Sequence, residues 1–317
     1  MLPDLTTQLG PLRLQSPLVL AASPWGAEAA SMGGSGIGAL TVNSIGPEPR
    51  VGHPEPTIYD WGEGLINAVG LRNPGAEASI KPLQHLKADL ARQGVVLIVS
   101  IFAETVDRYY DVGRAIVQAE PEMVEVNISC PNVEEEFGLP FATRQDTAAA
   151  ATRAAVAGLR EAGFGGPISV KLAPNVPNLI PIAEGVIEAG ADLLTVSNTL
   201  PGMVIDIEAR RPVLSHETGG ISGPALRPIA VRMVYELYEA FKVPIIGTGG
   251  VMRGRDAVEM IMAGATAVGL STVAHRYGAA GLRRVLTELD AWMSEHGVES
   301  LDAIRGAAHS RQRAPLP

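Results

Sequence analysis

The stretch Met123-Val124-Glu125-Val126-Asn127-Ile128-Ser129 is short and rich in branched apolar residues. Runs of this kind are typical of strands that are buried on both faces, as the strands of parallel sheets are. Seven similar runs occur elsewhere in the chain: Pro17–Ala22, Gly38–Ser44, Val95–Phe102, Pro167–Leu172, Asp192–Asn198, Val243–Gly249 and Ala265–Thr272. The sequence therefore predicts eight buried strands.

Segments with a helical spacing of apolar residues separate most of these strands: Ala76–Gln93, Asp146–Ala162, Asn178–Gly190, Leu226–Phe241, Arg255–Ala263 and Ala279–His296. This alternation predicts βαβ units and a parallel sheet. Eight units favour a closed (β/α)8 TIM barrel, and an open doubly wound sheet is the alternative. No G-x-G-x-x-G motif follows the first strand, which counts against a dinucleotide-binding sheet. We expect one domain over residues 1–317, with 306–317 as a flexible tail.

Three other segments bear on the shape of the barrel. Leu9-Gly10-Pro11-Leu12 predicts an N-terminal hairpin, which could plug the bottom of the barrel. The connections Ile45–Gly75, after the second strand, and Leu200–Gly223, after the sixth, are too long for simple turns. Loops that follow barrel strands lie on the face where active sites occur. We therefore expect both long loops to wall one pocket.

The composition argues against several classes of protein. A net charge of −9 makes the chain a poor candidate for binding nucleic acid or anionic lipid. Cys130 is the one cysteine and no two histidines are four residues apart, so we expect neither a disulfide nor a metal site. No signal-peptide pattern and no apolar run of about 18 residues is present. We expect a cytoplasmic protein without a membrane segment.

The end of the fourth strand carries a thiol between amide side chains. Asn127 and Ser129 are two residues apart and face the same side of the strand, and Cys130 follows at its exit. A thiol at such a place can act as a general base, and amides can hold a planar ligand. The alternative is that Cys130 is a small buried apolar residue, as most lone cysteines are.

Other strand ends carry polar residues as well. Lys171 lies inside an apolar strand, where it needs an anion or an ion pair, although it could also extend to the rim. Ser197-Asn198-Thr199 ends the sixth strand, and turn formation is the alternative role. Gly249-Gly250 and Ser271-Thr272 end the seventh and eighth strands, where barrels often bind phosphate, although glycine is also common in tight turns.

Longer motifs point to a family. The segments that carry the resemblance are Asn127–Asn132 (NISCPN), Ile66–Gly75 (INAVGLRNPG), Arg210–Leu214 (RRPVL) and Thr218–Ala225 (TGGISGPA). They resemble class 1 dihydroorotate dehydrogenases over Leu5 to about Arg305, and Glu48-Pro49-Arg50 and His296–Leu301 favour the class 1B branch. The resemblance implies an FMN barrel that oxidises dihydroorotate to orotate in pyrimidine biosynthesis. It also implies a homodimeric core and a possible separate subunit, carrying FAD and a 2Fe–2S cluster, that passes electrons to NAD+.

The resemblance further assigns roles to residues. Cys130 would take the C5 proton while the C6 hydride passes to the flavin, and Lys171 would stabilise the reduced flavin. Implied cofactor-binding residues are Ala22, Ser23, Asn43, Ser44, Ser100, Asn127, Lys171, Ser197, Gly223, Gly249, Gly250, Ser271 and Thr272. Implied substrate-binding residues are Asn43, Asn67, Ala68, Val69, Gly70, Leu71, Asn127, Asn132, Asn198 and Thr199.

The sequence also departs from the family pattern. Asn43 stands where the family has a lysine, and losing that charge beside a carboxylate could cost about 1–3 kcal/mol. Ser100 replaces an asparagine, and the surroundings of Ser23 and Ser271 differ as well. Two alternatives therefore stay open. One is a paralogous FMN oxidoreductase that acts on another dihydropyrimidine-like substrate, and the other is a non-catalytic barrel subunit.

Overall fold

The computed structural model describes residues 3–25, 29–130 and 138–310. Its centre is a closed barrel in which eight parallel strands neighbour one another in chain order and the last pairs with the first. The strands are β3 (Leu18–Ser23), β4 (Ala39–Val42), β7 (Val96–Ile101), β8 (Met123–Asn127), β9 (Ile168–Leu172), β10 (Leu193–Val196), β15 (Ile245–Thr248) and β16 (Ala267–Leu270). Each lies within one of the eight apolar runs, apart from one residue at the end of β3, so the predicted TIM barrel is confirmed.

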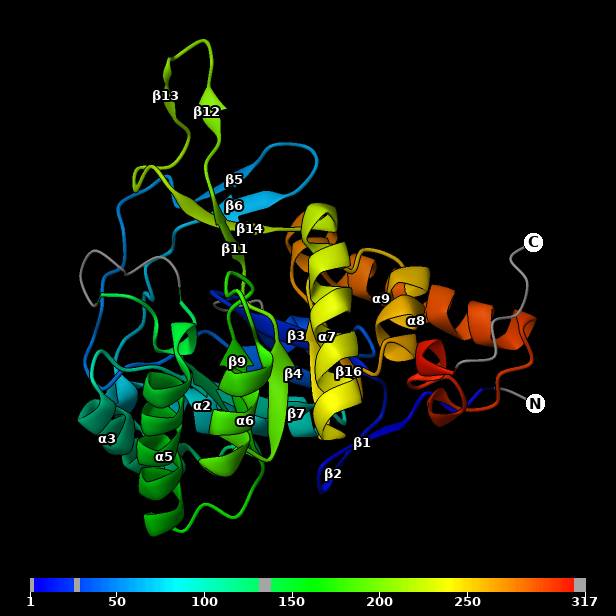
Figure 1. The fold of residues 1–317 in the computed structure, drawn as a ribbon, viewed down its shortest axis with the longest axis horizontal. Coiled ribbons are helices and arrows are strands. Elements are labelled where there is room, and N and C mark those ends of the chain that lie inside the picture. The colour runs from blue at the N-terminus through cyan, green and yellow to red at the C-terminus, as the bar shows by residue number, and fades with distance from the viewer. Residues whose placement is uncertain (1–2, 26–28, 131–137, 311–317) are drawn as a thin grey trace.

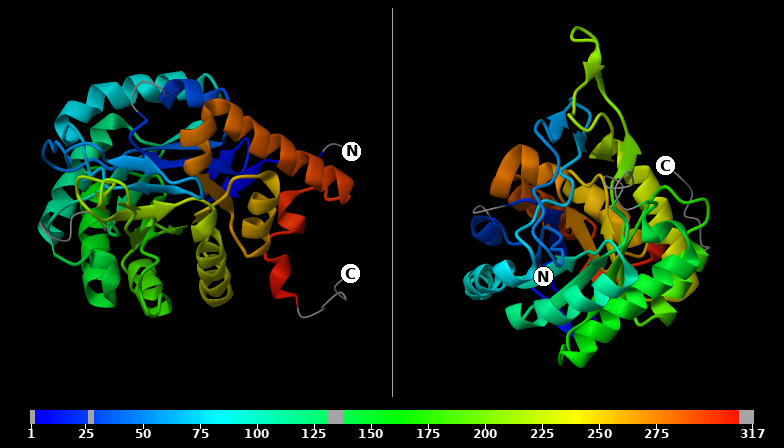
Figure 2. Two further views of the ribbon diagram at one scale, coloured as in Figure 1. Left: turned by 90° about the horizontal axis from the view of Figure 1, so that it is seen from above. Right: turned by 90° about the vertical axis from the view of Figure 1, so that its left-hand side faces the viewer.

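Helices surround the barrel on the outside (Figures 1 and 2). They are α1 (Ala29–Gly33), α2 (Ala76–Ala91), α3 (Val106–Ile116), α5 (Gln145–Glu161), α6 (Ile180–Glu188), α7 (Arg227–Phe241), α8 (Gly254–Met262) and α9 (Thr272–Glu295). The predicted helices are present, but α9 begins seven residues before the expected Ala279. The backbone of Gly278 is not helical, and the resulting kink separates the first turns of α9 from the apolar pattern that predicted the helix.

Helix α3 was not predicted from the sequence. It is strongly amphipathic, with Tyr109, Val112 and Ile116 buried at helical spacing, and the Thr105 side chain caps it by accepting a bond from the Arg108 N–H. Two aspartates and a glycine lower the apolar content of this short segment, so its periodicity is easily overlooked.

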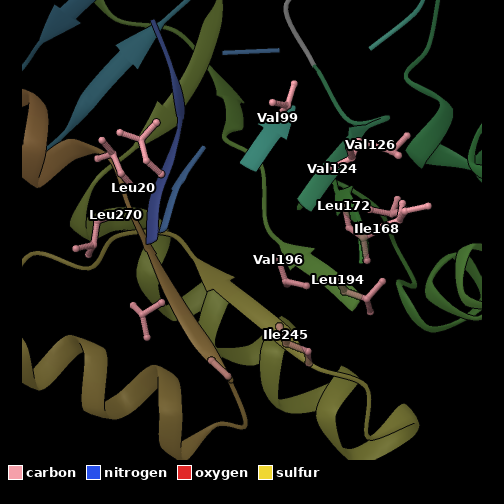
Figure 3. Close-up of a cluster of buried hydrophobic side chains, with 14 of the residues drawn as sticks. Leu20, Val99, Val124, Val126, Ile168, Leu172, Leu194, Val196, Ile245 and Leu270 are labelled. Carbon is pink, nitrogen blue, oxygen red and sulfur yellow. The ribbon is translucent and has the colours of Figure 1, made fainter. Parts of the chain in front are cut away.

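Side chains alternate along each barrel strand, and the two sides serve different purposes. The outward-facing residues pack beneath the helices, as Val124, Val126, Leu194 and Val196 do in Figure 3. The alternate positions of β8, among them Glu125 and Asn127, therefore face the barrel interior. The interior can thus carry polar groups without disturbing the apolar layer outside.

The bottom of the barrel is closed by an antiparallel hairpin, β1 (Thr7–Leu9) and β2 (Leu12–Leu14). Leu9 and Leu14 are fully buried and belong to an apolar cluster with residues near the start of the barrel strands, such as Ile98 and Met123. The predicted hairpin and its role as a plug are both confirmed.

The two long loops meet above the barrel. Strands β5 (Ile58–Asp60) and β6 (Leu65–Asn67) come from the first loop, and β11 (Leu200–Gly202) and β14 (Gly219–Ser222) come from the second. They form one antiparallel sheet in the order β11-β14-β6-β5. A second hairpin, β12 (Ile205–Asp206) and β13 (Arg211–Pro212), extends beyond it at the top of Figure 1.

This cover sheet, as we call β11-β14-β6-β5, is attached to the barrel wall by an ion pair. Arg276 of α9 donates two hydrogen bonds to the Asp60 carboxylate, at 2.8 and 2.5 Å, and a third to the Gly62 carbonyl. The hydrogen bond from Arg276 lowers the pKa of Asp60. The pair therefore stays ionised at neutral pH and holds the sheet to α9.

At the other end of the chain, short 3-10 helices occur at Leu301–Ala303 and Ala307–His309. His309 stacks on Tyr235, with ring centroids 3.7 Å apart, so the order reaches into the segment expected to be a tail. Residues 311–317 of that segment lie outside the described residues. Within the described ranges, no helix is long and apolar enough to cross a membrane.

We predict that Leu14→Ala destabilises the chain by about 2–5 kcal/mol, because it leaves a cavity where the hairpin fills the barrel. Urea denaturation measures this change. Arg13→Ala, at the exposed neighbouring position, is the control and should change stability by less than about 0.5 kcal/mol. Equal effects of the two substitutions would contradict the role of the hairpin as a plug.

Candidate active site

A cavity lies at the carboxyl end of the barrel, beneath the cover sheet. Ile58, Leu65 and Asn67 line it from the first long loop, and Thr199 and Ser222 line it from the segment after β10. The expectation that both loops wall one pocket is therefore confirmed.

The structure gathers most of the residues that the sequence singled out around this cavity. They are Ala22, Ser23, Asn43, Ser44, Asn67, Val69, Gly70, Leu71, Asn127, Cys130, Lys171, Ser197, Asn198, Thr199, Gly249, Gly250, Ser271 and Thr272. Three others do not line it. Ser100 is buried beside Ser44, Ala68 is buried under the cover sheet, and Gly223 follows the lining residue Ser222. Asn132 lies outside the described residues.

Cys130 is half-buried at the rim and packs against Leu71 and Phe102. Leu71 has φ +57°, a left-handed conformation that is rare for a bulky residue and is often found at functional sites. Two contacts stabilise it, because Asn73 donates a hydrogen bond to the Leu71 carbonyl and Phe102 packs on its side chain. The loop before Leu71 is thereby held against the cavity near the thiol.

Asn127 is held in place from several sides. Its Nδ2 donates to Ser44 Oγ at 2.9 Å, and its Oδ1 accepts from the N–H and the hydroxyl of Ser129, both at 3.2 Å. Its carbonyl accepts a bond from the Tyr109 hydroxyl at 2.7 Å. Burial raises the pKa of Tyr109, so this hydroxyl stays protonated and remains a donor. Asn198 extends the network by donating to Ser129 at 3.0 and 3.1 Å.

Lys171 lines the cavity and is paired with a buried carboxylate. Its Nζ lies 4.0 Å from Glu125 Oε1, and the two residues are 7% and 3% exposed. Ser100 donates to the same oxygen at 3.0 Å and lies 2.9 Å from Ser44, which links the ion pair to Asn127. At 4.0 Å the ammonium is too far away to hydrogen-bond this carboxylate, so its donors remain available to a ligand in the cavity.

Sequence reasoning assigned no role to Glu125, although the signal was present. A charged residue in the middle of an apolar barrel strand needs a partner, and the same argument drew attention to Lys171. His275 was also missed. It lines the cavity from the first turns of α9, lies 2.8 Å from Ser23 Oγ and stacks on Trp25. Nothing in its sequence neighbourhood distinguishes it from the other histidines.

The opposite end of the cavity carries groups that could hold an anion. Gly249 and Gly250 have positive φ angles, and a Cβ at Gly250 would come within 2.7 Å of the backbone of Gly223 and Arg227. Helix α9 begins at Thr272, and the first N–H groups of a helix lack intrahelical acceptors. The Thr248 hydroxyl, at the same end, is buried without a hydrogen-bond partner in the described part of the chain. These donors suit a phosphate group.

The cavity thus combines a cradle for a phosphate after the last two barrel strands with an ammonium, a thiol and amides at its other end. Among the described residues, no group of three or more histidine, cysteine or acidic side chains could hold a metal ion. This arrangement is typical of TIM-barrel enzymes that bind a phosphorylated organic cofactor beside their substrate.

Comparisons with known proteins identify the family. The family model for dihydroorotate dehydrogenase matches residues 4–293. A dihydroorotate dehydrogenase B (NAD(+)) catalytic subunit from Desulforudis audaxviator is 43% identical over 276 residues, 87% of each chain. One from Geobacter sp. (strain M21) is 37% identical over 310 residues, which is 96% of this chain and 98% of the relative. A crystal structure of the Eimeria tenella enzyme in complex with ferulenol superposes with a TM-score of 0.83, at 26% identity over 97% of this chain and 89% of that one.

The chain therefore belongs to the dihydroorotate dehydrogenase family, in its class 1B branch. Members of this family are flavin-dependent enzymes that oxidise dihydroorotate in pyrimidine synthesis. Membership favours an enzyme over the alternative of a non-catalytic barrel subunit.

We predict that Glu125 and Lys171 are energetically coupled. Removing one partner of a buried pair leaves an uncompensated charge, so Glu125→Gln and Lys171→Met should each cost about 3 kcal/mol. The double variant should cost less than their sum by at least about 1 kcal/mol. Chemical denaturation of the four proteins measures this difference. The pair of half-buried Lys87 and exposed Glu120 is the control and should couple by less than about 0.5 kcal/mol. Additive effects at Glu125 and Lys171 would contradict the prediction.

Proposed function

We propose that this chain is the FMN-containing catalytic subunit of a dihydroorotate dehydrogenase, with Cys130 as the base that removes the C5 proton of dihydroorotate. One observation carries the proposal. The thiol of Cys130, the ammonium of Lys171 and the amide of Asn127 line one cavity whose other end is a phosphate cradle. The substrate and the phosphate of the cofactor would occupy these two ends.

The thiol end suits the chemistry of dihydroorotate. Its ring presents two N–H groups and two carbonyls, and side-chain amides can both donate and accept hydrogen bonds. Asn67 and Asn198 line this end together with Asn127. The backbone of Gly70 and Leu71, with φ angles of +71° and +57°, adds main-chain groups beside the thiol. We propose that these residues, with Asn43, Val69 and Thr199, bind the substrate.

Cys130 is suited to proton abstraction by its place at the rim. It is partly exposed to the cavity and is held between Leu71 and Phe102, which restrict where its sulfur can move. A thiolate can take a proton once the thiol has ionised. The cover sheet lies over this region, and exclusion of bulk water by the sheet would strengthen the electrostatic effect of nearby charges.

The residues present fit FMN, both at the phosphate cradle and along the middle of the cavity. Bound there, FMN would supply the hydride acceptor for C6 of dihydroorotate. Lys171 supplies a buried positive charge in this middle region, and Glu125 and Ser100 hold it in position. A fixed cation there would stabilise negative charge that develops on a bound ligand during reaction. Ala22, Ser44 and Ser197 line the same region, and Ser271 and Thr272 line the cradle.

We also propose that a separate subunit completes the enzyme. The relatives are named catalytic subunits of NAD(+)-dependent enzymes, which implies a second chain in those proteins. With one cysteine, this chain cannot by itself hold a cluster with several cysteine ligands. FAD and a 2Fe–2S cluster would therefore lie on the partner, and two copies of this chain would form the core of the complex.

A second candidate is a paralogous FMN oxidoreductase that acts on a different dihydropyrimidine-like substrate. Asn43 favours it, because its Nδ2 donates to the Arg72 carbonyl at 2.8 Å and brings no positive charge into the cavity. A substrate without a carboxylate would need no cation at this position.

We predict that Cys130→Ala lowers dihydroorotate turnover about 100-fold or more, because general-base catalysis contributes about that factor. Turnover is followed with an artificial electron acceptor. Cys130→Ser should recover part of the rate only at higher pH, because serine is the weaker acid. Orotate binding, measured from the flavin spectrum, should change only a few-fold. An unchanged rate in Cys130→Ala would overturn the assigned role.

A second prediction separates the two candidate substrates. If dihydroorotate is the natural substrate, the cavity already binds it, and Asn43→Lys should change kcat/KM by less than about 10-fold, the factor that corresponds to 1.4 kcal/mol. A much larger gain with dihydroorotate would instead favour the paralogous oxidoreductase. Asn43→Gln is the control, because it keeps an amide and adds no charge.

A further inference from the structure

A groove runs between helices α7, α8 and α9 on the outside of the barrel. Five arginines line it: Arg227, Arg253, Arg255, Arg276 and Arg284. The whole chain carries a net charge of −9, so such a cluster of cations on one surface is unusual for it. A patch whose sign is opposite to that of the whole chain is a candidate for binding an acidic partner.

Two of these arginines have no ion-pair partner among the residues that the structure describes. Arg227 is paired with Asp256 and Glu259, Arg276 with Asp60, and Arg284 lies 3.7 Å from Glu288. Arg253 and Arg255 are exposed, and neither forms an ion pair with any described residue. The uncompensated charge of the groove is therefore concentrated at these two positions.

The position of Arg253 and Arg255 in the fold indicates that their positive charge does not stabilise the helix. Arg253 is the N-cap residue of α8, and Arg255 lies in its first turn. The N-terminus of a helix carries a partial positive charge, so cations there are unfavourable. Asp256 already caps this turn by accepting from the N–H groups of Met252 and Arg253. The helix is therefore capped without the side chains of the two arginines, and carboxylates from a partner would compensate their positive charge.

The rest of the groove has the composition of a protein interface. Tyr277 is 50% exposed, and the Arg284 guanidinium lies over its ring at 5.0 Å. Tyr235, Trp292 and Met252 also line the groove. Arginine, tyrosine, tryptophan and methionine are the residue types that are enriched where proteins meet, whereas an isolated anion site needs none of the aromatic residues.

The groove and the active-site cavity share a wall. Gly250 and Val251 line the cavity, and the next residues, Met252 and Arg253, line the groove. On α9, His275 lines the cavity, and the residues that follow it line the groove. A protein bound in the groove would therefore lie directly behind the phosphate-cradle end of the cavity.

We propose that this groove docks the electron-transfer subunit, which presents an acidic surface to Arg253 and Arg255. The proposal rests on the proposed function, because electrons from dihydroorotate must leave this chain for NAD+ through a partner. Short distance favours this transfer, and segments after β15 and at the start of α9 line both the cavity and the groove, so a partner in the groove would lie close to a cofactor in the cavity.

The test uses the chain produced together with the FAD- and 2Fe–2S-carrying subunit of the same organism. When the electron-transfer subunit is at limiting concentration, the double variant Arg253→Glu/Arg255→Glu should lower NAD+-linked turnover by at least about 10-fold. Its affinity for that subunit should fall by a similar factor, since charge pairs at interfaces are strongly coupled. Wild-type binding should also weaken as salt rises. Turnover with an artificial acceptor should stay within about two-fold, because neither arginine lines the active-site cavity.

The control is Arg114→Glu/Arg153→Glu, which reverses two exposed arginines on α3 and α5, on the other side of the barrel (Figures 1 and 2). It should leave NAD+-linked turnover unchanged. Equal loss in the control, or no loss in Arg253→Glu/Arg255→Glu, overturns the proposal. So does a change in the self-association of the chain without a change in NAD+-linked turnover, which would make the groove a contact between copies. Absence of dye-linked turnover in the wild type would instead refute the proposed function.

Discussion

The buried pair of Lys171 and Glu125 is the interaction on which the active site depends. Parallel pairing places Ser100 beside Glu125 on neighbouring strands, and Asn127 beside Lys171. A charge of either sign alone would be costly inside this barrel, so each residue makes the other tolerable. Their 4.0 Å separation leaves the ammonium able to interact with a ligand. The polar network that reaches Asn127 and Asn198 starts from the same carboxylate.

The closed barrel makes this network possible. Outward-facing residues such as Val124 and Val126 supply the apolar contacts with the helices, and the hairpin containing Leu9 and Leu14 seals the bottom. Stability therefore comes from the outer layer and the lower end. The interior at the carboxyl end can then hold a lysine, a glutamate and amides. The same polar groups would weaken an interior that also had to supply the apolar contacts of the core.

Much of this structure could be predicted from the sequence. The eight strands were predictable because strands buried on both faces leave continuous apolar runs, and the strand ends located Cys130, Lys171 and Asn198. The cover sheet was not, because its pairing of Asn67 with Gly220 joins residues 153 positions apart and no local pattern records it. Ser100 was expected to bind the cofactor but lies beside Ser44, one layer away from the cavity, a difference that only the packing reveals.

The central claim is that this cavity holds a flavin which dihydroorotate reduces directly. The most direct test is anaerobic addition of dihydroorotate to the purified, flavin-loaded chain without any partner subunit. The account predicts loss of the oxidised-flavin absorbance with about one orotate formed per flavin, as a single two-electron transfer requires. A flavin that stays oxidised in the presence of excess dihydroorotate, or a chain that cannot be loaded with FMN, would contradict it.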